Sequence, residues 1–235
     1  MRALIIIISL IIIEMNLTQV DKYASVRNKM VDTQIRDRGV TDPDVLRAMR
    51  KVPRHLFVPE EYIDDAYGDY PLPISQGQTI SQPYIVAFMT EAAGPSKNKK
   101  ALEIGTGSGY QAAILAETTG TVYSIEIIPE LAAEATSTLK KLGYENITVR
   151  AGDGYNGWPE HAPFDIILVT AAADKIPEPL IDQLAEGGRL VIPVGRQGAT
   201  QELKLLTKKR GKVETERLIY VRFVPFKRSG EINDK

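Results

Sequence analysis

Apolar and polar residues alternate along the second half of the chain in a pattern that predicts strands and helices in turn. Short apolar runs of strand length are each followed by a stretch with apolar residues at helical spacing. The predicted strands are residues 101–104, 121–126, 146–150, 165–169 and 189–194, and the predicted helices are residues 109–118, 129–142 and 177–185. This alternation predicts an α/β fold, with a doubly wound, mostly parallel sheet and helices on both of its faces.

The last part of the chain departs from this alternation. Residues 201–207 and 213–224 flank the sequence KKRGK, which predicts a C-terminal antiparallel hairpin. We interpret Lys208, Lys209 and Arg210 as a solvated turn. The residues after Phe226 are polar, and we expect them to be frayed.

The first part of the chain predicts a helical cap. Residues 17–38 have helical spacing and stop at Gly39, and Thr41 is the expected N-cap of a second helix that ends near residue 52. Residues 68–83 are rich in proline and glycine and predict a long ordered loop, followed by a helix over residues 84–93. We therefore divide the chain into an apolar extension (residues 1–16), a helical cap with a substrate loop (residues 17–98) and a core (residues 99–235), within one compact domain.

The apolar extension allows several interpretations. Residues 3–13 are apolar except for Ser9, which is far short of the ~20 residues that span a bilayer. The length suits a signal peptide, but Arg2 is the only basic residue before it and no small-residue cleavage site follows. The alternatives are translation from Met15 and a packing element.

A glycine-rich turn follows the first predicted strand. Gly105, Gly107 and Gly109 stand between this strand and a helix, which is the opening of a nucleotide-binding βαβ unit of Rossmann-like type. The next predicted strand ends at Glu126, about 20 positions after Gly105, where a carboxylate can hold the hydroxyls of a ribose. Together the two signals favour a cofactor that carries a nucleoside over a purely structural turn.

Other polar residues follow the remaining strands. Asp153 can accept a hydrogen bond from an exocyclic amine such as that of adenine, or can belong to an ordinary Asp-Gly turn. Thr170 and Ala171 provide a small uncharged wall suited to a substrate, whereas Asp165 lies at the opposite end of its strand and is expected to be structural. From its spacing alone, Ser81 is best explained as the N-cap of the helix over residues 84–93.

Composition narrows the chemistry. The chain has 235 residues, of which 43% are hydrophobic and 25% charged, and its net charge of −1 provides no attraction for nucleic acid. The absence of cysteine excludes disulfides, cysteine nucleophiles and thiolate metal sites. The only histidines, His55 and His161, do not have the spacing of metal ligands, and no GxSxG motif indicates a serine triad. We expect neither a metal nor a nucleic-acid partner.

These motifs resemble those of a known family. The segments LEIGTGSGYQAAILA, VYSIE, GDG, PFDIILVTAA and EGGRLVIPVG resemble successive motifs of the class I S-adenosylmethionine-dependent methyltransferases. The loop PLPISQGQTISQPYIVAFM looks like the signature of the protein-L-isoaspartate (D-aspartate) O-methyltransferases. The resemblance covers residues 28–226 and leaves out the isoleucine-rich start.

The resemblance implies a function and a set of site residues. It implies repair of damaged proteins by methylation of L-isoaspartyl, and sometimes D-aspartyl, carboxylates with S-adenosylmethionine. It assigns Ser81 to the active site, which replaces the interpretation as a cap, and it places the loop from Ser75 to Thr79 against the cofactor or the substrate. The residues implied to bind the cofactor are Ser75, Gln76, Gly77, Gln78, Thr79, Glu103, Gly105, Thr106, Gly107, Gly109, Glu126, Gly152, Asp153 and Gly154. A cytoplasmic monomer is the expected form.

The implied chemistry suits a site without histidine. A substrate α-carboxylate has a pKa of ~3.5 and is already ionised at neutral pH, so no general base is needed. Ser81 and nearby loop amides are the candidate donors to that carboxylate. The alternatives are a nicotinamide-dependent oxidoreductase, which the GxGxG spacing disfavours, a nucleotide-binding module without catalysis, and a methyltransferase for small molecules or nucleic acid.

Overall fold

The computed structural model describes residues 21–230. The predicted apolar extension, with its competing interpretations, lies outside the described residues. Within residues 21–230 no helix is long and apolar enough to cross a membrane.

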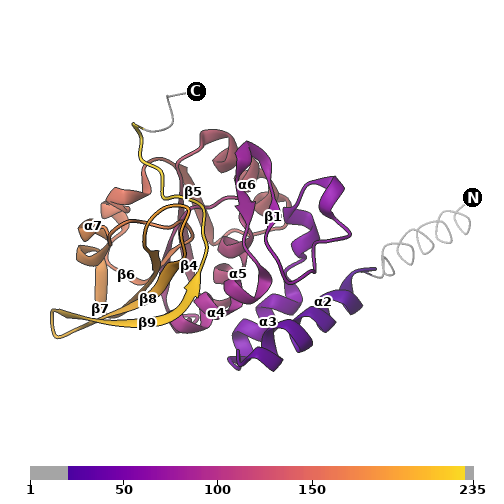
Figure 1. Ribbon diagram of the computed structural model, residues 1–235, viewed down its shortest axis with the longest axis horizontal. Coiled ribbons are helices and arrows are strands. Elements are labelled where there is room, and N and C mark those ends of the chain that lie inside the picture. Colours follow the sequence, from indigo (N-terminus) through magenta and orange to yellow (C-terminus); the bar gives the residue numbers. More distant parts are fainter. Residues whose placement is uncertain (1–20, 231–235) are drawn as a thin grey trace, which may run out of the picture.

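A seven-stranded sheet forms the centre of the molecule (Figure 1). Its order is β5-β4-β3-β6-β7-β8-β9. Strands β3 to β7 run parallel to one another, β8 pairs antiparallel with β7, and β9 pairs antiparallel with β8. The strands are β3 (Lys100–Ile104), β4 (Thr121–Glu126), β5 (Ile147–Ala151), β6 (Phe164–Val169), β7 (Leu184–Val194), β8 (Gln201–Lys209) and β9 (Lys212–Val221). The predicted mostly parallel sheet with a C-terminal hairpin is confirmed.

Helices bury both faces of this sheet. They are α4 (Pro83–Ala93), α5 (Tyr110–Thr118), α6 (Pro129–Lys141) and α7 (Glu178–Asp182). In β6, Ile166 and Leu168 belong to the hydrophobic cluster on the α4 and α5 face, whereas Ile167 and Val169 belong to the cluster that includes Leu180 of α7. Side chains of a strand point alternately to its two faces, so burial on both sides explains the continuous apolar runs in the sequence.

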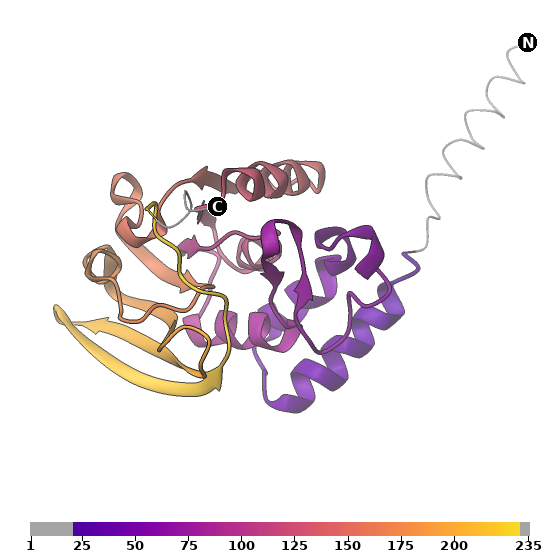
Figure 2. The same ribbon diagram turned by 45° about the horizontal axis from the view of Figure 1, so that its top comes forward.

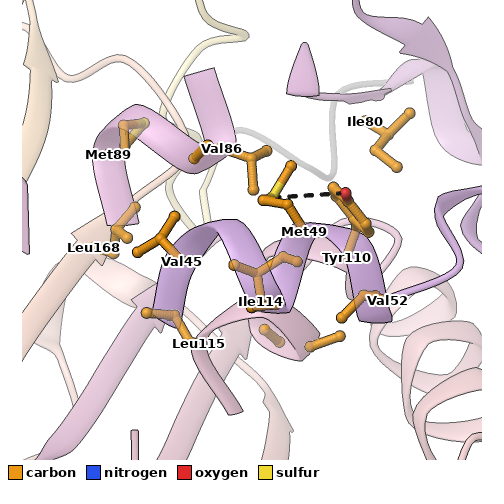
Figure 3. Packing of buried hydrophobic residues seen from close by; sticks show 14 of the residues in the cluster. Val45, Met49, Val52, Ile80, Val86, Met89, Tyr110, Ile114, Leu115 and Leu168 are labelled. Atoms are coloured by element: carbon orange, nitrogen blue, oxygen red, sulfur yellow. Dashed lines mark hydrogen bonds between the residues drawn. The ribbon is translucent and has the colours of Figure 1, made fainter. Parts of the chain in front are cut away.

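The helical cap packs on the first of these faces. It contains α2 (Ala24–Met30), a π-helical turn (Val31–Ile35), a 3-10 turn (Arg36–Arg38) and α3 (Pro43–Lys51). Figure 3 shows Val45 and Met49 of α3 against Val86 and Met89 of α4 and Leu168 of the sheet. The cap and the sheet therefore share one hydrophobic cluster, and in Figure 2 the cap lies at the opposite end of the molecule from the β8–β9 hairpin.

The N-cap of α3 is Asp42, so the prediction of Thr41 is wrong. The Asp42 carboxylate accepts hydrogen bonds from the backbone N–H groups of Asp44 and Val45 at 2.9 and 3.0 Å. Pro43 occupies the first helical position, where its missing N–H costs nothing, and this fixes the residue before it as the cap. The backbone N–H of Thr41 instead donates to Glu91 Oε1.

The proline-rich segment contains a small hairpin where the sequence predicted only a loop. Strands β1 (Leu72–Pro73) and β2 (Thr79–Ile80) pair antiparallel, and residues 75–77 form the turn between them. Ser81 follows this hairpin directly but does not cap α4, because Gln82 holds the N-cap position and no side chain caps the helix. The interpretation of Ser81 as an N-cap is therefore wrong.

Two boundaries near the C-terminus also differ from the prediction. The helix predicted over residues 177–185 ends at Asp182, and β7 begins at Leu184. Lys208 belongs to β8 rather than to a solvated turn, and its ammonium group donates to the backbone carbonyls of Ile181 and Leu184 at 3.3 and 2.9 Å. The ammonium group thus links β8 to the end of α7, where a cation interacts favourably with the helix dipole, and to the first residue of β7.

Candidate active site

A cavity opens at the carboxyl ends of β3, β4 and β6. This edge cavity encloses about 580 Å³ of space, part of which is open to solvent. It lies where the strand order reverses, since β3 pairs with β4 on one side and β6 on the other. It is lined by Gln78, Thr79, Ile104, Gly105, Gly107, Ile125, Glu126, Ile127, Ile128, Gly154, Thr170, Ala171, Val224, Pro225, Phe226 and Lys227.

Two glycines in the lining have no room for a side chain. Gly105 has a φ of +95°, and a Cβ there would collide with Thr170 Oγ1. A Cβ on Gly154 would collide with Cγ2 of Ile104, which lines the same cavity. Glycine at these positions therefore lets the backbone pack closely against Thr170 and Ile104 at the edge of the cavity.

Thr170 holds the glycine turn in place. Its hydroxyl lies 3.0 Å from the carbonyl of Ile104 and 2.6 Å from that of Gly105, and its N–H donates to the carbonyl of Ile104 at 2.9 Å. The hydroxyl proton is thus committed to the backbone of β3 and its turn. Contact of Thr170 or Ala171 with a substrate stays a prediction, although both residues line the cavity.

Glu126 presents a partly satisfied carboxylate to the cavity. Its Oε2 accepts from the N–H of Gly107 at 2.8 Å and its Oε1 accepts from the N–H of Ile128 at 3.1 Å, while only 5% of the residue is exposed. Burial raises the pKa of Glu126, and these backbone donors oppose that effect. Each carboxylate oxygen can accept a second hydrogen bond, so the group is equipped to bind hydroxyls.

Glu103 lies beneath the glycine turn and does not line the cavity. Its Oε2 accepts from Ser124 Oγ at 2.5 Å, and Ser124 Oγ lies 2.6 Å from Thr106 Oγ1. Complete burial raises the pKa of Glu103 to about 8. Both Glu103 and Thr106 therefore support the turn from inside the protein, and direct contact with a cofactor stays a prediction.

Only some of the site residues predicted in the β1–β2 hairpin line the edge cavity. Gln78 and Thr79 line it, whereas Ser75 Oγ is bonded to Glu134 Oε2 at 2.7 Å. Gln76 and Gly77 both have positive φ, at 58° and 65°, which turns the chain sharply before Gln78. Roles for Ser75, Gln76 and Gly77 stay predictions.

Ser81 stands where two hollows meet. It lines a small cavity together with Gly105, Gly107 and Thr170, and it also lines a groove that opens beside the end of β9. We call this second hollow the side groove; its wall includes Gln82, Thr200, Tyr220 and Arg222. Ser81 is half-buried, and within residues 21–230 its hydroxyl has no hydrogen-bond partner. It is therefore free to donate to a ligand that reaches from the groove toward the glycine turn.

Asp153 is turned toward the C-terminal segment. Its Oδ1 accepts from the N–H of Tyr155 at 2.9 Å, and its Oδ2 accepts from Arg228 Nε at 2.9 Å. Burial raises the pKa of Asp153, but the bonds from Arg228 and Tyr155 outweigh it and hold the pKa below its usual value. The carboxylate acts as the cap of the turn that begins at Gly154, and a role for Asp153, Gly152 or Gly109 in cofactor binding stays a prediction.

One wall of the edge cavity, which we call its cover, was not predicted from the sequence. Val224, Pro225, Phe226 and Lys227 line it, and the N–H of Phe226 donates to the carbonyl of Ala172 at 2.8 Å. Residues 227–229 are thus held on the body of the protein, and the expectation of a frayed tail is wrong up to that point. The apolar sequence FVPF beyond the last strand was the signal for this cover.

Neither histidine lines the edge cavity or the side groove. His55 Nδ1 lies 2.7 Å from the hydroxyl of Tyr67 in the cap, and His161 stacks on Tyr123 at 4.0 Å between ring centroids. In the part of the chain that the structure describes, no group of histidine and acidic side chains could hold a metal ion. The predicted structural role of Asp165 fits its bond from the N–H of Lys100 at 2.8 Å.

Comparison with known proteins gives a consistent result. The sequence model of the protein-L-isoaspartate(D-aspartate) O-methyltransferase family matches residues 25–231. A protein-L-isoaspartate O-methyltransferase of Opitutus terrae is 60% identical over 202 residues, which cover 86% of this chain and 87% of that protein.

Two solved structures share the fold. One, described as a protein-L-isoaspartate O-methyltransferase, is 31% identical with a TM-score of 0.79, and the match covers 86% of this chain and 66% of that chain. Another, from Plasmodium falciparum in complex with S-adenosyl-L-homocysteine, is 29% identical with a TM-score of 0.74. The match covers 86% of this chain and 98% of that chain. This chain belongs to the protein-L-isoaspartate(D-aspartate) O-methyltransferase family.

Proposed function

We propose that this chain transfers a methyl group from S-adenosylmethionine to the α-carboxylate of L-isoaspartyl residues in damaged peptides and proteins, and that Ser81 orients that carboxylate. Membership of the family supports the reaction. The observation that carries the role of Ser81 is its hydroxyl, which has no hydrogen-bond partner among the described residues and is half-buried between the side groove and the glycine turn.

The edge cavity fits S-adenosylmethionine. The cavity lies at the glycine turn, where Gly105 and Gly154 have no room for a Cβ, and Glu126 retains acceptor capacity on both oxygens. Glu126 would hold the ribose hydroxyls, and Gly105 and Gly107 would lie against the amino-acid part. When bound, the cofactor supplies an electrophilic methyl group on a positively charged sulfur.

The residues of this chain have to orient a carboxylate rather than remove a proton. The substrate α-carboxylate is ionised at neutral pH, with a pKa of ~3.5, so the absence of histidine from both hollows is no handicap. Donation from Ser81 Oγ–H stabilises the carboxylate once water has left. The segment Val224 to Lys227 forms part of the wall of the edge cavity and would limit the access of water to a bound ligand.

Paired peptides test the proposed reaction. We expect labelled methyl groups from S-adenosylmethionine to enter a peptide that contains L-isoaspartate and not its twin with ordinary aspartate. Equal labelling of both, or of neither, would refute the proposal. A D-aspartyl version of the same peptide tests the second specificity that the family name carries, and calorimetry with S-adenosylhomocysteine and with NAD tests the oxidoreductase alternative.

We further propose that the protein acts as a monomer in the cytoplasm on protein substrates and not on nucleic acid. The net charge of −1 supports the last point, because binding to a polyanion relies on an excess of basic residues. Light scattering and a mobility-shift titration test these two points, and fractionation of cells tests the location.

A further inference from the structure

The side groove contains a cationic group that the proposed reaction does not use. The groove has a volume of about 900 Å³ and runs between the segment Ser81–Gln82 and the end of β9. Arg222 is the only charged residue in its lining. Its guanidinium is therefore the charged group of the described lining that a peptide meets beside Ser81.

Arg222 is exposed and, among the described residues, has no ion-pair or hydrogen-bond partner for its side chain. The neighbouring carboxylates are already engaged by other arginines. Asp69, whose carbonyl accepts from Gln82, pairs with Arg38 at 2.7 Å. Glu202, which lies opposite Tyr220 in the sheet, pairs with Arg217 at 3.5 Å. Arg222 thus differs from these arginines in having no internal anion.

We propose that Arg222 binds a carboxylate side chain next to the isoaspartyl residue, so that the enzyme prefers damaged sites with an acidic neighbour. A guanidinium presents a planar fork that matches a carboxylate with two parallel hydrogen bonds. The exposed ring of Tyr220, 63% accessible, provides an apolar surface along the same wall. This inference rests on the proposed function and adds a specificity determinant to it.

The carboxylate that Arg222 binds is not the one that is methylated. The reacting carboxylate must reach the glycine turn, and Ser81 is the residue that lines both the groove and the small cavity beside that turn. Arg222 lines only the groove. An ion pair between Arg222 and the reacting carboxylate would stabilise that carboxylate before the reaction and oppose its attack on the methyl group. An ion pair between Arg222 and a neighbouring residue strengthens binding without opposing the reaction.

Matched peptides measure this preference. Three isoaspartyl peptides differ only in one residue beside the isoaspartate, which is Glu, Gln or Lys, and a second set places that residue on the other side. For wild-type protein we expect a KM for the better-placed Glu peptide about threefold to fivefold below that for its Gln twin, in line with a partly exposed ion pair. We expect the Glu and Gln peptides to have equal kcat values, because the contact with Arg222 has the same strength in the bound substrate and in the transition state. Raising NaCl from 50 to 300 mM should reduce the difference in KM between the Glu and Gln peptides, because salt screens the ion pair.

Variants assign the effect to one residue. In Arg222→Gln the KM ratio of the Glu and Gln peptides should fall to one, and in Arg222→Glu the Lys peptide should become the best substrate. Arg210→Gln is the matched control: it removes the same charge from the far turn of the same hairpin and should keep the wild-type ratio. An Arg222→Gln protein that keeps the preference, or a wild type without one, overturns the inference. If the wild type fails to methylate the Gln peptide at all, the proposed function itself is wrong.

Discussion

The edge cavity and the side groove differ in the bonding of their key polar side chains. In the edge cavity, Glu126 and Thr170 are bonded to the protein's own backbone. In the side groove, the hydroxyl of Ser81 and the guanidinium of Arg222 have no partner within the described residues. We infer from this difference that the edge cavity is preorganised for a ligand of fixed structure, whereas Ser81 and Arg222 stay available to a peptide in the side groove.

The largest effect should come from crowding the glycine turn. Gly105→Ala forces a methyl group against Thr170 Oγ1 at a φ of +95°, so we expect a loss of about 1–3 kcal/mol in the free energy of unfolding and at least tenfold weaker binding of S-adenosylhomocysteine. Urea unfolding and calorimetry measure the two effects.

Gly39→Ala is the control for backbone strain alone. Its φ is +97°, but nothing lies within 4 Å of a Cβ there. It should lose stability while keeping normal ligand affinity. Normal affinity in Gly105→Ala as well would show that the turn is not part of the ligand site.

Removal of the Glu126 carboxylate should be next in size. Glu126→Ala eliminates two acceptors of backbone N–H groups and the proposed ribose partner, and hydrogen bonds to a charged group are worth about 1.5–3 kcal/mol each. We expect S-adenosylhomocysteine to raise Tm much less than in the wild type. Glu130→Ala, at an exposed position in the first turn of α6, should show the wild-type shift. An equal shift in Glu126→Ala would contradict the assignment.

The hydroxyl of Ser81 should affect turnover. Ser81→Ala removes one hydrogen bond to a carboxylate, so we expect kcat on an isoaspartyl peptide to fall about tenfold to a hundredfold. Ser81→Thr keeps a hydroxyl and should recover part of the loss. Ser96→Ala, at an exposed hydroxyl that is bonded to Asn98, serves as the control. Full activity of Ser81→Ala would remove Ser81 from the mechanism.

The smallest effect concerns the support beneath the turn. Glu103 keeps its proton in the folded protein up to about pH 8, whereas the unfolded chain releases it near its ordinary pKa of about 4.3. The folded state therefore binds more protons in between, and the wild type should lose stability as pH rises through this window, by at most about 1.4 kcal/mol per pH unit.

Glu103→Gln removes the titrating group and should flatten that dependence, as followed by urea unfolding between pH 5 and pH 8. Glu145→Gln, at an exposed position, should retain the wild-type slope. Parallel pH profiles of wild type and Glu103→Gln would show that Glu103 is ionised in the folded protein.

The sheet and the glycine turn could be predicted from the sequence because they depend on local pattern. Apolar runs buried on both faces, and glycines between strand and helix, carry their signal within a few residues. What the sequence did not reveal depends on contacts between distant segments. The sequence around Lys208 suggests a turn, whereas in the structure its ammonium group donates to the carbonyls of Ile181 and Leu184.

The cover of the edge cavity is the clearest example. Phe226 returns to pair with Ala172, and Arg228 reaches Asp153, so the polar tail is ordered by partners far away in the sequence. The same limit applies to Ser81. Its spacing before α4 suggests a cap, and only the family resemblance pointed to the active site; the structure then explains why the hydroxyl is free.

Calorimetric titration of S-adenosylhomocysteine into Ser81→Ala and Glu126→Ala tests most directly whether the two parts of the site have separate tasks. The account predicts that Ser81→Ala binds the ligand with wild-type affinity, while Glu126→Ala binds it at least tenfold more weakly. Equal weakening in both variants, or unchanged affinity in Glu126→Ala, would contradict the division between the edge cavity and the side groove.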